Sequence, residues 1–213
     1  MANPRPVTIA LRSLRCIEET DEVGADEPYV LVTACDLTSS LPQVETTLYG
    51  PFSDVDAGET LNTHPLPANA PQSVIDSLSA LFITRRPFWS LNNRTGKVIS
   101  NLNQVIFIVS MMENDDGRAA AARTAVKLAA TGSIVNALSL PRADRVQKLI
   151  ADINGALKLP TGAPNFDDLI GSKELRPAAG DVQLETAGSK RSLSLDFAGD
   201  GGRYRAFFDI VAV

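Results

Sequence analysis

Apolar and polar residues alternate over short stretches at both ends of the sequence, and this two-residue period most restricts the possible folds. Residues 7–17 (VTIALRSLRCI) follow it, and residues 28–37 (PYVLVTACDL) form a short apolar run. Both are typical of strands with one or two buried faces. Near the C-terminus the pattern returns in three segments separated by glycine-containing turns: DVQLETAG (181–188), SLSLDFAG (192–199) and RYRAFFDIVAV (203–213). We therefore expect an antiparallel pair at the start and a β-meander at the end.

The middle of the sequence changes from strand to helix. Residues 97–112 end in a β-branched run typical of a central strand. Residues 118–138 are then rich in alanine, and a second segment from Pro141 carries apolar residues at helical spacing. A helical hairpin over 118–158 is the prediction.

The predicted fold is mainly β. We expect one antiparallel β-sandwich domain over residues 1–213, with the helical hairpin 118–158 inserted into it. A short helix is predicted over 71–83, where Asn69 and Pro71 precede apolar residues at helical spacing. Residues 38–67 are rich in turn formers and are expected to be irregular.

Composition and charge exclude some functions. The net charge of −5 and the isoelectric point near 4.9 argue against nucleic-acid binding, which needs a concentrated lysine and arginine face. We find no apolar stretch long enough for a transmembrane segment, and the start, MANPRPVTIALRS, lacks the apolar core of a signal peptide. A cytoplasmic location is the default expectation, with export by another route left open.

The two cysteines, Cys16 and Cys35, flank the first predicted turn at similar distances. They are either reduced and half-buried, or paired across the hairpin if the protein is exported.

Acidic residues cluster at the ends of three predicted strands, at 21–27, 113–116 and 167–168. Loops at one end of a sandwich converge, so clusters distant in sequence can form one pocket. Carboxylates gathered in this way protonate, acquire basic partners or bind a hard cation. Ca²⁺ fits best because it accepts many oxygen ligands from flexible loops, whereas Mg²⁺ demands octahedral geometry. Zn²⁺ is disfavoured because the chain has one histidine, His64.

The first cluster lies in a longer stretch, LRSLRCIEETDEVGADEPYVLV (11–32), that resembles the first calcium loop of C2 domains. In that family an acidic residue, a glycine three places on, and an acidic residue followed by Pro-Tyr lead into an apolar strand. Asp21, Gly24 and Glu27-Pro28-Tyr29 fill these places. The second half of the resemblance is interrupted: IFIVSMMENDD (106–116) and FDDLIG (166–171) match the other calcium loop, with the helical hairpin between them.

The resemblance implies a C2-like sandwich that binds Ca²⁺ through carboxylates. The implied ligands are Asp21, Glu27, Glu113, Asp115 and Asp168. Further ligand positions are Asp26, Asp116 and Asp167.

The function expected from these patterns is non-catalytic calcium binding, with docking to anionic lipid or to a protein partner through the bound ion. Catalysis is disfavoured because there is no G-x-S-x-G, P-loop or G-x-G-x-x-G motif and one histidine only. The alternative is a protein-interaction or structural module with a vestigial acidic edge, which docks through the helical insertion.

Overall fold

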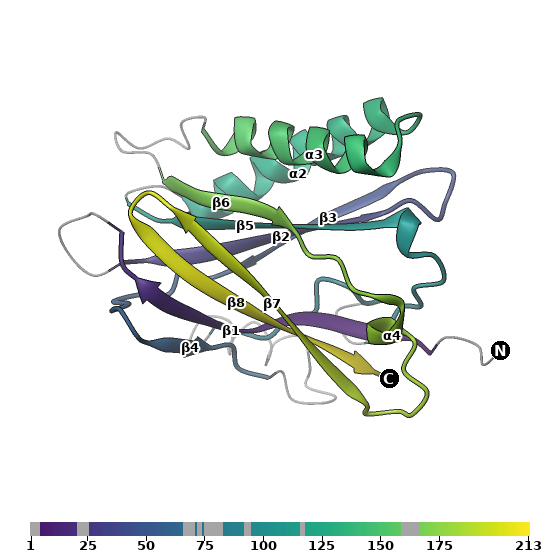
Figure 1. Cartoon of the computed structure of the whole chain (residues 1–213), viewed down its shortest axis with the longest axis horizontal. Coiled ribbons are helices and arrows are strands. Elements are labelled where there is room, and N and C mark those ends of the chain that lie inside the picture. Colours follow the sequence, from purple (N-terminus) through teal and green to yellow (C-terminus); the bar gives the residue numbers. More distant parts are fainter. Residues whose placement is uncertain are drawn as a thin grey trace.

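Two four-stranded antiparallel sheets pack face to face, and a helical hairpin covers the outer face of one of them (Figure 1). The computed structural model describes residues 5–20, 26–65, 71, 74, 83–91, 95–115, 118–158 and 167–213. The predicted antiparallel β-sandwich with an inserted helical hairpin is confirmed.

The two sheets differ in what covers their outer faces. The open sheet consists, in spatial order, of β4 (Thr60–Asn62), β1 (Val7–Glu18), β8 (Gly202–Ala212) and β7 (Lys190–Gly199). The helix-covered sheet consists, in the same sense, of β3 (Gln43–Tyr49), β2 (Pro28–Asp36), β5 (Val105–Glu113) and β6 (Asp168–Glu174). Every residue of β2 and β5 is buried, because one face of these strands packs on the open sheet and the other on the helices. This double burial explains why their sequences are continuous apolar runs.

The helical hairpin consists of α2 (Ala119–Ala137) and α3 (Arg142–Leu157). Its buried faces form one apolar cluster with the outer faces of β2 and β5, including Ile134, Leu149 and Ile108. A short 3₁₀ helix, η1 (Leu102–Gln104), precedes β5, and a single turn, α4 (Ala179–Val182), follows β6. None of the described helices has the length and apolar content needed to cross a membrane.

Three local predictions differ from the structure or fall outside it. Residues 38–67 contain the edge strands β3 and β4 rather than only irregular chain. In β3, Val44 and Tyr49 are buried, and so is Thr46, whose hydroxyl lies 3.1 Å from that of Thr33 in β2. Residues 181–188 do not form a strand; α4 and a turn replace it. Of the helix predicted over 71–83, only positions 71, 74 and 83 are among the described residues.

The cysteines are free, and both are buried. Cys16 faces the core between the sheets, whereas Cys35 faces the helical hairpin. Burial raises the pKa of both thiols, that of Cys35 to about 12. Because the two cysteines lie in different apolar clusters, they are not paired with each other in this structure.

Candidate functional site

The ends of β2, β5 and β6 meet at one edge of the helix-covered sheet. Pro28, at the start of β2, pairs with Glu113, the last residue of β5, and Glu113 pairs on its other side with Asp168, the first residue of β6. Parts of the three acidic clusters thus lie side by side. We call the described carboxylates at this place the acidic edge: Asp26, Glu27, Glu113, Asp115, Asp167, Asp168 and Asp200.

Glu113 is the central member of the acidic edge. It is 2% exposed, and its Oε1 accepts a hydrogen bond from the backbone N–H of Glu27 at 3.0 Å. Its Oε2 is buried and has no hydrogen-bond partner among the described residues. Burial, together with the charges of Asp115 and Asp26, raises the pKa of Glu113 to about 7. A buried carboxylate with one unsatisfied oxygen is costly unless a proton or a cation neutralises it.

Asp168 experiences the same excess of negative charge. Its pKa is raised by burial first, then by the charge of Asp200 and a hydrogen bond with it, and then by Asp115 and Asp167. Asp200 lies in the turn between β7 and β8 with φ of +50°, and Figure 1 shows this turn beside the start of β6. The two sheets therefore both supply carboxylates to the acidic edge.

Asp200 is the member of the site that sequence reasoning missed. The segment GDGGRYR (199–205) indicates a hairpin turn, and a turn residue with a short polar side chain needs no other explanation. Its position in the chain could have indicated it. Alternate turns of an antiparallel sandwich lie at the same end, so the turn that contains Asp200 could have been expected near the other acidic loops.

Asp26 is held by protein groups. It is 2% exposed and accepts hydrogen bonds from the Thr20 backbone N–H at 3.0 Å, from the Thr20 hydroxyl at 2.7 Å and from the Tyr204 hydroxyl. Both carboxylate oxygens are engaged, and Tyr204 belongs to the opposite sheet. Asp26 thus anchors the start of β2 to the open sheet.

The carboxylates of Glu27 and Asp167 both accept a hydrogen bond from a nearby side chain. The Asn114 side-chain amide donates to Glu27 Oε2 at 3.0 Å, and the Tyr29 hydroxyl donates to Asp167 Oδ2 at 2.6 Å. Burial and the hydrogen bond to Asp167 raise the pKa of Tyr29, so this hydroxyl remains a donor. Asp167 also lines a pocket of about 300 Å³ between the end of α3 and the β7–β8 turn. The pocket residues are Leu157, Lys158, Asp167, Asp168, Leu169 and Asp200.

Two of the predicted ligand positions, Asp21 and Asp116, lie outside the described residues, as does Gly24. Within the described part of the chain, no group of three or more His, Cys, Asp or Glu side chains is arranged to hold a metal. Within the same part, no Lys or Arg forms an ion pair with Glu27, Glu113, Asp115, Asp168 or Asp200. These five carboxylates therefore converge without basic partners in the described part of the chain, and the fit of the acidic edge to a cation rests on their charge and on the unsatisfied oxygen of Glu113.

Comparisons with known proteins give one similarity. No protein-family model matches the sequence, and no curated protein matches it. Among solved structures, the chain is similar to the C2A domain of a plant extended synaptotagmin 1, with a TM-score of 0.37 and 8% sequence identity, over 98% of this chain and 95% of that chain. The β-sandwich architecture itself stands on the strand pairing described above.

Proposed function

We propose that the protein is a non-catalytic, C2-like calcium-binding module and that the acidic edge is its ion site. The observation that carries the proposal is Glu113, a buried carboxyl with one unsatisfied oxygen and a pKa raised to about 7, between carboxylates from neighbouring strand ends. A divalent cation would neutralise this charge and satisfy that oxygen in one step.

The proposed ligands are those that the sequence indicated, Asp21, Glu27, Glu113, Asp115 and Asp168, with Asp200 added. Asp116 and Asp167 remain additional positions, whereas the hydrogen bonds of Asp26 favour an anchoring role for it. Ca²⁺ suits this set because oxygen ligands from several loops can adjust around it, and an ion of this size accepts both Asp and Glu arms.

Calcium binding would have a consequence beyond stability. Coordination positions that the protein leaves open would accept a phosphate or carboxylate oxygen from an anionic lipid or from a protein partner. This docking role is supported by the resemblance of the calcium-loop motifs to those of C2 domains.

A second candidate function is favoured by the surface of the helical hairpin. Leu128, Val135 and Leu138 on or next to α2 have exposed fractions of 70%, 56% and 45%. An interaction module that docks through this helix would bury them, and it would not need an ion at the acidic edge.

Thermal unfolding tests the proposal. Melting temperatures are measured in EGTA, in Ca²⁺ and in Mg²⁺ for the wild type, for Glu113→Gln and for Glu185→Gln, an exposed carboxylate remote from the acidic edge. We expect Ca²⁺ to raise the melting temperature of the wild type and of Glu185→Gln, and to have little effect on Glu113→Gln. If millimolar Ca²⁺ does not raise the melting temperature of the wild type, the proposed ion site is wrong, and the helical hairpin becomes the candidate binding surface.

A further inference from the structure

The outer face of the open sheet is not covered by any described helix; α2 and α3 lie on the far side of the other sheet (Figure 1). This face carries basic side chains from three strands and from the segment that follows residue 83. We call it the basic face; its cations are Arg12, Arg15, Arg85, Lys190, Arg203 and Arg205.

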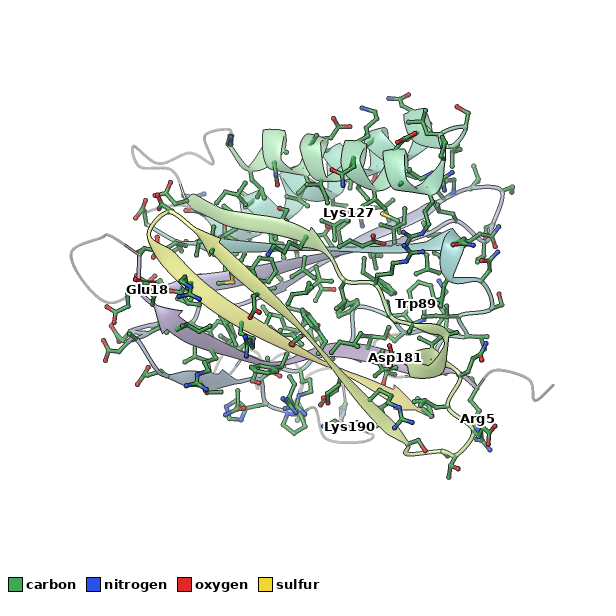
Figure 2. The ribbon with its side chains drawn as sticks, viewed as in Figure 1. Arg5, Glu18, Trp89, Lys127, Asp181 and Lys190 are labelled. Carbon is green, nitrogen blue, oxygen red and sulfur yellow. The ribbon has the colours of Figure 1, made fainter. Side chains whose placement is uncertain are left out.

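The basic face has more positive than negative charge. Within the described residues, five of its six cations form ion pairs, and these pairs involve three acidic residues: Glu18, Asp196 and Asp209. Figure 2 shows Glu18 and Lys190 toward opposite ends of this sheet. Asp209 is buried, and it is shared by Arg12 at 3.8 Å, Arg85 at 3.9 Å and Lys190 at 2.7 Å, so one carboxylate faces three cations. The face is electropositive on a chain whose net charge is −5.

The outer cations of the basic face differ in how firmly they are paired. Arg203 and Glu18 are 3.8 Å apart and both more than half exposed, and a pair of this kind contributes roughly 0–1 kcal/mol. Arg205 holds Asp196 by two hydrogen bonds, from Nε to Oδ1 at 2.5 Å and from Nη2 to Oδ2 at 3.1 Å, so another carboxylate would have to displace Asp196. Arg15 lies directly opposite Arg205 in the register and makes no ion pair within the described residues. Arg15 and Arg203 can therefore turn to carboxylates of another molecule at little cost.

The outer side of β8 presents its residues in a regular row. Arg203, Arg205 and Phe207 alternate with the buried Tyr204 and Ala206, which places them about 7 Å apart along the strand. The Phe207 ring is half-buried, and the Arg12 guanidinium lies 5.3 Å from its centroid. An extended chain has the same two-residue repeat, so acidic side chains two positions apart would meet Arg203 and Arg205, and the next side chain on that side would lie over Phe207. Arg15 lies across the ladder from Arg205 and is within reach of the same segment.

We infer that the basic face docks an extended acidic protein segment with Asp or Glu at alternate positions. Arg15 and Arg203 bind its carboxylates, and Arg205 joins them by exchanging Asp196 for a carboxylate of the segment. This surface is separate from the acidic edge and does not depend on an ion there.

A protein segment fits this face better than an anionic bilayer does. Asp200 precedes Arg203 in the same hairpin and belongs to the acidic edge, so a flat anionic surface lying on the basic face would also approach those carboxylates. A narrow segment lying along β8 contacts the arginines and leaves the acidic edge in solvent.

The test uses a fluorescein-labelled peptide of alternating Glu and Ser, an isomer with the same glutamates in one block, and vesicles containing phosphatidylserine. Binding to the full-length protein is measured by fluorescence anisotropy and by vesicle sedimentation, in EGTA, at low and at high salt. The variants are Arg15→Ser/Arg205→Ser and a control that loses the same charge from exposed positions elsewhere, Arg123→Ser/Arg176→Ser.

We expect the alternating peptide to bind more tightly than the block isomer, and its affinity to fall about tenfold in Arg15→Ser/Arg205→Ser and less than about twofold in the control. Equal affinity for the two peptides, equal loss in both variants, or binding to vesicles alone would each overturn the inference. Because EGTA is present throughout, neither result bears on calcium binding, which the melting experiment decides separately.

Discussion

Gly199 lies so close to Ile170 that a β-carbon at position 199 would be 2.2 Å from the Ile170 carbonyl oxygen. Gly199 ends β7 in the open sheet, whereas Ile170 belongs to β6 in the helix-covered sheet. This backbone contact brings Asp200 to Asp168 and so joins the two sheets at the acidic edge.

Gly199→Ala is therefore expected to destabilise the protein by about 1–3 kcal/mol, because a backbone segment and not a flexible side chain would have to move. Urea unfolding measures the loss. Gly155→Ala is the matched control: it lies within α3 with open space around the added methyl group, and we expect it to stabilise by roughly 0.5–1 kcal/mol. Equal stability of the two variants would contradict the close approach.

Asp26→Asn tests whether that carboxylate anchors the loop or binds an ion. The amide can accept fewer hydrogen bonds from Thr20 and Tyr204, so unfolding in urea should require about 1–3 kcal/mol less free energy. The calcium-induced rise in melting temperature should remain. Loss of that rise with unchanged stability in EGTA would assign Asp26 to the ion site instead.

The pH dependence of stability should carry the signature of Glu113. Its pKa is about 7 in the folded protein against an ordinary value of 4.5, so between these values the folded state binds more protons than the unfolded state. The free energy of unfolding must then fall as pH rises from about 4.5 to 7, and the raised pKa of Asp168 adds in the same direction at the acidic end.

Denaturant unfolding across this range, in EGTA, should show a weaker fall for Glu113→Gln than for the wild type. Asp36 and Asp196, whose pKa values are lowered by Lys97 and Arg205, act at more acidic pH and leave this window undisturbed. Identical pH profiles for the two proteins would contradict the burial of an uncompensated Glu113.

The helical hairpin should contribute strongly to stability. Leu149→Ala removes a fully buried side chain between the helices and the sheet, and we expect a loss of about 2–5 kcal/mol. Leu128→Ala, on the solvent side of α2, should stay within about 0.5 kcal/mol of the wild type. If Leu128→Ala instead abolishes binding to a partner without loss of stability, the helix is a docking surface.

The sequence predicted the parts of the fold that depend on local pattern. The alternation in β1 and the apolar runs of β2 and β5 report burial directly, and the helical spacing around Val126 and Leu149 reports one packed face. Edge strand β3 was missed because a strand at the edge of a sheet tolerates polar residues, which weaken the alternation of polar and apolar positions. The burial of Val44 follows from the packing of α2 over β3, which the local sequence does not indicate.

The sequence predicted which segments form the candidate site, but not the hydrogen bonds and charge interactions of its side chains. Strand-end position indicated Glu113 and Asp168 as neighbours, and the β-ladder pairs them. The engagement of Asp26 by Tyr204 and the approach of Asp200 both depend on contacts between the two sheets. Such contacts follow from sheet packing, which a local pattern does not encode.

The hairpin α2–α3 leaves the sandwich after Glu113 and returns at Asp168, and these two residues are paired neighbours. Because its two ends are neighbours, the hairpin could be deleted and β5 joined to β6 by a short loop. Such a deletion would uncover Leu31, Ile106 and Ile108, whose apolar side chains are covered by the hairpin in the described structure. Without the hairpin, this apolar sheet face would be exposed to solvent and to other molecules. We therefore expect the inserted hairpin to protect the sandwich from aggregation.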